Sequence, residues 1–270
     1  MNSLSSLVNS LSTTNSYIPT MAAIKKTVLI TGSTRGIGLA LATQYTEAGW
    51  NVIGTVRASS NTDKVHYAFY VLVALSPFKI ITIDTTDETS VAEAARQLDG
   101  VAIDLLINNA GTGFLTEIVE PTKELFVKVF EVNVVGPFLV SRALESNLQL
   151  AAKTHGSASI VQISSVLGSI TSNTVGAFAS TFKGQYSYTT TKAALNMMTR
   201  SLAMDLRDSN VAVVAVHPGY VNTELTGNLG VLKPADVAAA IASVVDKVAI
   251  EDTGKFLNAD PTYPNAELPW

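Results

Sequence analysis

The feature that most constrains the fold of this chain is an alternation of short β-branched apolar runs with longer segments of helical character. The runs are TVLI (27–30), NVIGTV (51–56), KIITI (79–83), DLLI (104–107), SIVQI (159–163), VAVVAV (211–216) and KFL (255–257). Apolar runs of this kind are typical of parallel strands that helices cover on both faces of a sheet. The pattern therefore predicts a single-domain α/β protein with a doubly wound, seven-stranded parallel sheet. In such sheets ligands bind beyond the carboxyl ends of the strands.

The segment between Arg57 and Lys79 has an ambiguous pattern. A doubly wound fold requires a helix there, but YAFYVLVALSPF (67–78) is equally typical of a strand. Periodicity does not separate the two in so short an apolar run, so both assignments stay open.

The N-terminal residues differ in composition from the rest of the chain. Residues 1–20 carry no charge and are rich in Ser, Asn and Thr, which predicts a disordered extension over residues 1–23 and a folded domain over 24–270. They form neither the apolar block of a secretory signal nor an arginine-rich transit peptide, so a cytoplasmic location is expected.

Composition limits the partners. Charged residues make up 15% of the chain and apolar residues 47%, which predicts a large core and a homodimer or homotetramer. The formal charge of −4 and the lack of a basic run argue against nucleic acid or a membrane, so a small-molecule partner is expected. The longest apolar run, FYVLVAL (69–75), is too short to cross a bilayer.

Metal and thiol chemistry are not expected. The chain has no cysteine, which excludes disulfides, Cys-ligated zinc and thiol catalysis. Its three histidines, His66, His155 and His217, lie far apart in the sequence and none has the spacing of a metal ligand. Structural roles are expected for all three.

A run of three threonines, Thr189 to Thr191, separates Tyr188 from Lys192. β-Branched residues are poor helix formers, so something other than propensity must hold this segment. If the segment is helical, the spacing of four places the phenol and the ammonium on one face, one turn apart.

A glycine cluster, TGSTRGIG (31–38), follows the first apolar run. Glycines permit a tight turn and let the backbone and the next helix N-terminus approach a pyrophosphate. The spacing differs from the commoner G-x-G-x-x-G, and a glycine cluster alone is also compatible with an ordinary turn. Its place between a strand and a helix favours a dinucleotide site.

Seven motifs, in order along residues 25–258, resemble those of the short-chain dehydrogenase/reductase family. They are TGSTRGIG (31–38), Asp84 in TIDTTD, NNAG (108–111), Asn133 in VNVVG, Ser165 in ISSVLG, Tyr188 with Lys192, and Pro218–Gly219 with Thr223. The resemblance implies a Rossmann-type reductase domain that binds a nicotinamide cofactor. The C-terminal residues are similar to the tails of sniffer-type carbonyl reductases, C-factor proteins and fungal norsolorinic acid ketoreductases, except at DPTYPNAE (260–267).

The resemblance also implies the site residues. The catalytic set is Asn133, Ser165, Tyr188 and Lys192. The cofactor-binding set is Gly32, Ser33, Thr34, Arg35, Gly36, Ile37, Gly38, Arg57, Asp84, Thr85, Asn109, Ala110, Gly111, Tyr188, Lys192, Pro218, Gly219, Val221 and Thr223.

In the mechanism that the resemblance implies, hydride passes to a substrate carbonyl carbon while Tyr188 protonates the oxygen and Ser165 donates a hydrogen bond to it. A free phenol has a pKa near ~10, and an adjacent ammonium and an oxidised nicotinamide both favour its anion. Lys192 also holds the nicotinamide ribose, and Asn133 orders a water that links Lys192 to solvent.

Three of these assignments have alternatives. Ser164 competes with Ser165, although the family pattern S-x-x-G fits Ser165 with Gly168. Asn133 could instead be a buried residue at a helix bend. Asp84 could be a simple turn residue.

Two arginines bear on the choice of cofactor. An NAD site usually has an acid at the end of the second strand, and here that position is Arg57, with Arg35 inside the glycine loop. Two cations suit a 2′-phosphate, so NADPH is expected. The alternative is that both arginines are solvated surface residues.

The expected substrate is a bulky or aromatic carbonyl compound. The connection GSITSNTVGAFASTFKGQ (168–185) joins the serine to the tyrosine and should form one wall of the pocket or, alternatively, pack at a subunit interface. Phe178 and Phe182 lie in this connection, and Phe114 and Leu115, just after NNAG, are expected on the opposite side of the pocket. Val166, next to Ser165, completes the expected substrate residues. The chain is thus expected to be an NADPH-dependent carbonyl reductase. The alternatives are an alcohol dehydrogenase or isomerase on the same scaffold and a non-catalytic NADPH-binding sensor or scaffold.

Overall fold

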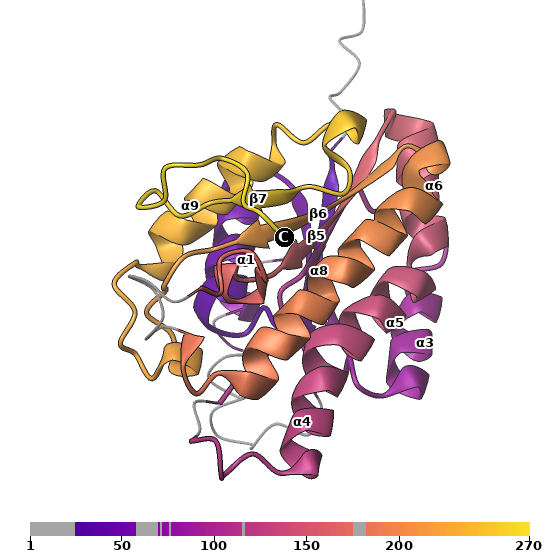
Figure 1. Ribbon diagram of the computed structural model, residues 1–270. Coiled ribbons are helices and arrows are strands. Elements are labelled where there is room, and N and C mark those ends of the chain that lie inside the picture. The colour runs from indigo at the N-terminus through magenta and orange to yellow at the C-terminus, as the bar shows by residue number, and fades with distance from the viewer. Residues whose placement is uncertain (1–24, 58–69, 71, 76, 115–116, 175–181) are drawn as a thin grey trace, which may run out of the picture.

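The computed structural model describes residues 25–57, 70, 72–75, 77–114, 117–174 and 182–270 (Figure 1). Its strands are β1 (Thr27–Ile30), β2 (Asn51–Val56), β3 (Lys79–Thr82), β4 (Leu105–Asn108), β5 (Ala158–Ile163), β6 (Val211–His217) and β7 (Phe256–Asn258). They form one seven-stranded sheet in the order β3-β2-β1-β4-β5-β6-β7, and every neighbouring pair is parallel. This confirms the predicted sheet. The extension expected over residues 1–23 lies outside the described residues.

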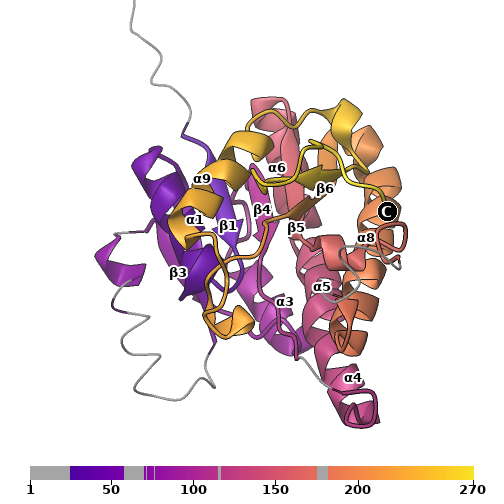
Figure 2. The ribbon, with the colours of Figure 1, turned by 60° about the vertical axis from the view of Figure 1, so that its left-hand side comes forward.

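Helices cover both faces of the sheet, as Figure 2 shows edge-on. The helices are α1 (Gly36–Glu47), α3 (Glu88–Arg96), α4 (Lys123–Phe130), α5 (Gly136–Ala143), α6 (Glu145–His155), α8 (Tyr186–Leu206) and α9 (Pro234–Val245). The helices α1 and α9 lie on one face, and α3, α5 and α8 lie on the other. Three short segments bear on the site: η1 (Glu131–Val135), a π-helix between α4 and α5, and the 3₁₀ turns η2 (Val166–Gly168) and η4 (Glu224–Thr226). A further 3₁₀ turn, η3 (Arg207–Ser209), follows α8.

The two faces explain why the strands are apolar throughout. Successive residues of a strand point to opposite faces of the sheet. In β1, Val28 and Ile30 pack in the core under α1 and α9, whereas Leu29 packs in the core under α3, α5 and α8. Since neither face meets water, neither set can be polar.

The strand order indicates where a ligand would bind. The order reverses between β1 and β4, and doubly wound sheets bind ligands at this switch point, beyond the carboxyl ends of the strands. The glycine loop follows β1 there, and the NNAG residues begin at the end of β4.

The ambiguous segment is helical where the structure describes it. Tyr70 and residues 72–74 are helical, and Leu72 is buried in the core under α1 and α9. A side-chain carbon built on Gly54 of β2 would lie 2.7 Å from Leu72, so the glycine makes room for this helix. Residues 58–69, 71 and 76 lie outside the description.

Candidate active site

The helix α8 carries Tyr188 and Lys192 one turn apart, with Lys192 buried. The threonines between them bond to the helix's own backbone: Thr189 Oγ1 donates to Gln185 O (2.9 Å) and Thr191 Oγ1 donates to Tyr188 O (2.9 Å). Threonine hydroxyls in helices often use such carbonyls. The hydroxyls are therefore satisfied inside the packed helix despite their weak helix propensity.

Lys192 faces both Tyr188 and the end of β5. Its Nζ donates to Ile163 O (2.7 Å) and lies 5.6 Å from the centroid of the Tyr188 ring. Burial lowers the pKa of Lys192 to about 8. The ammonium form still predominates at neutral pH, so a positive charge lies beside the phenol.

The hydroxyl of Ser165 lies close enough to Tyr188 to influence its ionisation. Burial raises the pKa of Tyr188 to about 12, and the nearby Ser165 hydroxyl lowers it. The sequence analysis expected the Lys192 ammonium and an oxidised nicotinamide to lower the pKa of Tyr188. In the protein alone, burial instead keeps this pKa above its ordinary value. The phenol is neutral at physiological pH.

Two glycines let the turns approach Tyr188 and Lys192. A side-chain carbon on Gly168 would lie 2.6 Å from the Lys192 backbone, so the turn that carries Ser165 rests directly on α8. One on Gly113 would lie 2.6 Å from the Tyr188 ring. Both contacts are closer than any side chain tolerates, so one loop packs on the helix backbone at Lys192 and the other packs on the Tyr188 ring.

The two candidate serines point to different partners. Ser164 is buried and its hydroxyl donates to Asn196 Oδ1 (2.6 Å). Ser165 caps η2, where its Oγ accepts from Leu167 N (3.2 Å), and it meets Tyr188. The geometry therefore places Ser165, and not Ser164, beside the phenol.

Asn133 lies in the π-helix η1 and is fully buried. Its side chain accepts from Thr112 N (2.8 Å) and donates to Thr112 O (2.8 Å) and Thr191 Oγ1 (3.0 Å). Asn133 is therefore a buried residue at a helix bend, and its catalytic role stays a prediction. The same bend ties the loop after β4 to the helix that carries Tyr188.

In the glycine loop, the start of α1 packs directly on the backbone at Gly32. A side-chain carbon on Gly38 would lie 2.2 Å from Gly32 O, and Gly36 has a φ of +55°. The amide of Asn109 donates to Thr31 O (2.9 Å) and Gly32 O (3.2 Å). These contacts hold the start of α1 against the loop after β4, as a cradle for a pyrophosphate requires.

Two cofactor-set residues have side chains that serve the protein itself. The hydroxyl of Ser33 is buried, where it accepts from Thr55 N (2.7 Å) and donates to Thr55 O (3.2 Å). The side chain of Val221 packs in the core under α1 and α9. Only their backbone groups therefore face a ligand.

The two arginines expected to choose the cofactor have acidic neighbours. Arg35 forms an ion pair with Glu224 (3.2 Å), in which both side chains are more than 60% exposed. Arg57 is exposed at the end of β2. Burial raises the pKa of Asp84, but hydrogen bonds from Thr86 and the charge of Arg57 together bring that pKa below its ordinary value. Exposed ion pairs are weak, so the pair of Arg35 with Glu224 contributes little to stability.

Asp84 forms hydrogen bonds within its own turn, as expected if it is a turn residue. Its Oδ1 accepts from Thr86 N (3.0 Å) and Thr86 Oγ1 (2.7 Å). The next residue, Thr85, is buried against Gly136, where a side-chain carbon would lie 2.9 Å from Thr85 Oγ1.

The remaining cofactor-set residues surround the same crevice. Ala110 contacts Gly32, and Gly111 lies between Asn133 and Lys192. Thr34 and Ile37 belong to the glycine loop and the first turn of α1. Pro218 and Gly219 follow β6, and Thr223 packs against Gly36.

Sequence comparison decides the family. The model of the short chain dehydrogenase family matches residues 26–231, which is most of the chain. The chain is a short-chain dehydrogenase. The C-signal protein of Myxococcus xanthus is 32% identical over 169 residues, which cover 62% of this chain and 93% of that protein.

Two solved structures of carbonyl reductases resemble this short-chain dehydrogenase. The NADPH-bound carbonyl reductase from chicken fatty liver has a TM-score of 0.80 and 30% identity, over 91% of this chain and 99% of that one. The carbonyl reductase Sniffer of D. melanogaster has a TM-score of 0.79 and 27% identity, over 92% of this chain and all of that one.

The structure describes three of the five expected substrate residues. Phe114 is 40% exposed just beyond β4, and Phe182 is half-buried before α8. Val166 is buried with Phe256 in a small core cluster, so its side chain contributes to packing. Leu115 and Phe178 lie outside the described residues.

The sequence analysis missed several residues that shape the site. Thr31 accepts hydrogen bonds from Asn109 N (3.0 Å) and Ala110 N (3.1 Å), and Thr191 and Gly113 position Asn133 and Tyr188. For Thr31, the signal was its place at the carboxyl end of a strand. For Gly113, the signal was a second glycine two residues after Gly111.

The histidines in the described part of this short-chain dehydrogenase have protein partners. His155 pairs with the buried Asp104 (2.6 Å), and His217 contacts Asp260 and two backbone amides. His66 lies outside the description. No group of acidic or His side chains that could hold a metal ion, and no helix that could span a membrane, occurs among the described residues.

Proposed function

We propose that the chain is an NADPH-dependent carbonyl reductase in which Tyr188 is the proton donor. The observation that carries this proposal is the placement of Ser165 and Tyr188 next to each other and beside the buried Lys192. Two hydroxyl groups at one point suit a carbonyl oxygen, which gains negative charge as its carbon is reduced.

The protonation states favour reduction. Burial raises the pKa of Tyr188 to about 12, so the phenol carries the proton that a reduced carbonyl oxygen needs. Ser165 donates to the same oxygen, and the Lys192 ammonium stabilises the phenolate that is left. An alcohol dehydrogenase would start from the phenolate, which burial disfavours in this protein.

The residues around the crevice fit a dinucleotide. The tight Gly32–Gly38 contact and the free backbone amides at the start of α1 suit a pyrophosphate, and Lys192 with Tyr188 would hold the nicotinamide ribose. When bound, NADPH supplies the hydride for the carbonyl carbon. Catalytic roles for Asn133, Ser165, Tyr188 and Lys192 remain part of this proposal.

Preference for NADPH is supported by charge. Arg35 and Arg57 lie after the first two strands, at the end of the sheet where the adenosine ribose of a dinucleotide binds. A guanidinium pairs well with a phosphate and gains little from ribose hydroxyls. The NADPH-bound chicken enzyme is consistent with this choice.

A bulky or aromatic carbonyl substrate follows from the loops beside Tyr188. Phe114 leaves 40% of its side chain exposed, and Ile170, after the serine turn, leaves 78%. The segment 220–231 is pinned at both ends by the bridge of Val221 with Leu232, so it is too short for a large lid. We infer an open apolar cleft.

Solution state and location complete the proposal. We propose a homodimer or homotetramer in the cytoplasm, and exposed apolar side chains on α4, η1, α5 and α8 suit the subunit contacts. These side chains are Val127, Phe130, Val135, Phe138, Met197 and Met204.

A panel of aldehydes, ketones, quinones and aromatic ketones of graded size tests the proposal. The readout is the loss of NADPH absorbance with purified protein. We expect turnover with NADPH that exceeds turnover with NADH, and higher kcat/KM for aromatic ketones than for small polar ones. NADPH binding without turnover of any carbonyl would instead support the sensor or scaffold alternative.

A further inference from the structure

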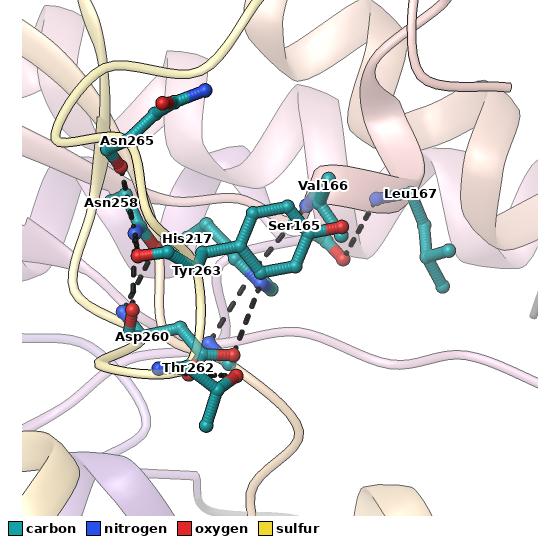
Figure 3. A network of polar contacts seen from close by, with 10 residues as sticks. Ser165, Val166, Leu167, His217, Asn258, Asp260, Thr262, Tyr263 and Asn265 are labelled. Atoms are coloured by element: carbon teal, nitrogen blue, oxygen red, sulfur yellow. Dashed lines mark hydrogen bonds and ion pairs between the residues drawn. The ribbon is translucent and has the colours of Figure 1, made fainter. Parts of the chain in front are cut away.

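Three neighbouring strands end in one polar network. The residues that follow or end β5, β6 and β7 include Ser165, His217 and Asp260, and Figure 3 shows them around a single imidazole. The carboxyl ends of parallel strands meet at one edge of the sheet, so these residues come together although they are far apart in sequence.

The hydrogen bonds of His217 determine its tautomer. Its Nδ1 accepts from Val166 N (3.3 Å) and from Gly219 N (3.4 Å). Backbone N–H groups only donate, so Nδ1 must be unprotonated and the imidazole proton must lie on Nε2.

Asp260 faces the protonated nitrogen. Its Oδ2 lies 3.9 Å from His217 Nε2, and its Oδ1 accepts from Thr262 N (2.8 Å) and Thr262 Oγ1 (2.7 Å). The turn therefore holds the carboxylate with one oxygen toward the imidazole. Tyr263 places its ring edge-on to His217, at 5.9 Å between centroids.

The Asp260 carboxylate belongs to the C-terminal segment DPTYPNAE (260–267), which departs from the pattern of the similar families. The amide of Asn258 donates to Asp260 O (3.1 Å) and Asn265 O (2.9 Å), and its Oδ1 accepts from Asp260 N (2.9 Å). A side-chain carbon on Gly219 would lie 2.9 Å from Asp260, so the segment also packs against the loop after β6.

We propose that His217 is a positioning residue that fastens the Ser165 turn and the Pro218–Gly219 loop to one imidazole nitrogen, in a tautomer that Asp260 maintains. Val166 N directly follows Ser165, and Gly219 N lies in the loop assigned to the cofactor. One side chain thus sets the spacing between the serine hydroxyl and that loop. The kinetic part of this inference rests on the proposed function, whereas the tautomer does not.

Nitrogen-15 NMR of histidine-labelled protein tests the tautomer directly. We expect His217 to show an unprotonated Nδ1 and a protonated Nε2, with no change from about pH 8 down to about pH 5.5, below the ordinary histidine pKa. The chain has three histidines, so comparison with His217→Asn assigns the signal. A protonated Nδ1, or titration near the ordinary pKa, would overturn the proposal even if the chain reduces no carbonyl.

Two substitutions test the positioning role. In His217→Asn, Oδ1 is the same number of bonds from the backbone as Nδ1 and can accept the same amides, whereas His217→Leu offers no acceptor. With NADPH saturating, we expect His217→Leu to lower kcat about tenfold, since two hydrogen bonds are lost, and His217→Asn to recover most of it. Equal kcat for the two variants, with both folded by circular dichroism, contradicts the role; if His217→Leu does not fold, the NMR result decides.

Discussion

At the scale of single residues, burial sets the chemistry of the site more than neighbouring charge does. Tyr188 and Lys192 lie within one helical turn, yet burial moves both pKa values toward the neutral form, up for the phenol and down for the ammonium. The pair therefore holds a proton on the phenol at neutral pH, as an acid catalyst must.

The first prediction concerns that proton. Tyr188→Phe should lower kcat for carbonyl reduction by about a hundredfold or more, because it removes the general acid. The dissociation constant for NADPH should rise only a few-fold, because one hydrogen bond to the ribose is lost and Lys192 remains to hold it; fluorescence titration measures this constant.

The matched control is Tyr186→Phe, which removes a phenol hydroxyl two residues earlier from a side chain that is 37% exposed. It should leave kcat unchanged. A Tyr188→Phe enzyme that keeps more than a tenth of the wild-type rate would remove Tyr188 from the mechanism.

The second prediction concerns Arg57. Arg57→Asp should weaken NADPH and improve NADH, because a carboxylate accepts from ribose hydroxyls and repels a phosphate. A charge-assisted contact is worth about 1.5 to 3 kcal/mol, so the ratio of kcat/KM values should move by about ten- to a hundredfold. Arg207→Asp, at an exposed arginine in η3, is the control for a change of net charge. Equal use of both cofactors by the wild type would refute the charge argument.

At the scale of elements, the site depends on how closely loops approach α8. Gly113 and Gly168 leave no space for a side chain where they meet Tyr188 and Lys192. The loops after β4 and β5 thus hold the helix between them, and Asn133 links the first of these loops to Thr191.

The third prediction follows from the Gly113 contact. Gly113→Ala would place a methyl group 2.6 Å from the Tyr188 ring, so the ring or the loop must shift. We expect kcat to fall about tenfold, as for a misplacement of a catalytic group by a fraction of an ångström. Overpacking should also lower the free energy of unfolding by about 1 to 3 kcal/mol. A wild-type kcat would show that the loop moves aside freely.

Sequence alone predicts the elements better than their contacts. All seven strands lie within two residues of their predicted positions, because each is an apolar run between polar turns. Two features escaped prediction: the π-helical form of the bend at Asn133, which helix propensity does not encode, and the network of His217 with Asp260. That network joins residues that are distant in the sequence and meet only because their strands are neighbours in the sheet.

At the scale of the whole molecule, three helices carry exposed apolar side chains. The helices α4, α5 and α8 lie beside one another in Figure 1, and they carry Phe130, Phe138, Met197 and Met204 among their exposed side chains. Patches of this kind mark interaction sites.

The fourth prediction is that this surface joins copies of the chain. Phe138→Glu should lower the mass measured by light scattering after size exclusion, because it places a charge in an apolar contact. Val231→Glu, at a 77% exposed valine away from these helices, should not. A wild-type protein that runs as a monomer at micromolar concentration rules out the interface.

The fifth prediction concerns acid. Burial lowers the pKa of His217 to about 4, although Asp260 raises it, so between about pH 6.5 and 4 the unfolded chain binds the proton and the folded chain does not. Stability from this group is complete above pH 6.5 and is lost as pH falls toward 4, by on the order of 2 to 3 kcal/mol. Urea unfolding of wild type and His217→Asn across this range should show a steeper loss for wild type.

Equal slopes for the two proteins would contradict the buried neutral imidazole. Among the described residues, the titratable side chains placed against His217 are Asp260 and Tyr263, both from the C-terminal segment. Tyr263 stays neutral throughout this pH range, since burial and Asp260 raise its pKa.

The π-helix at Glu131–Val135 joins α4 to α5 without a break and sets how far α5 is rotated about the common helix axis relative to α4. A π turn holds about one residue more than an α turn, and each residue of an α-helix advances about 100° around the axis. Without that residue, α5 would rotate by about this angle relative to α4 and carry Leu139 and Val140 out of the core that they now fill. A substitution at Asn133 therefore removes one set of hydrogen bonds, whereas deletion of any single residue from the turn would put the whole of α5 out of phase with the sheet.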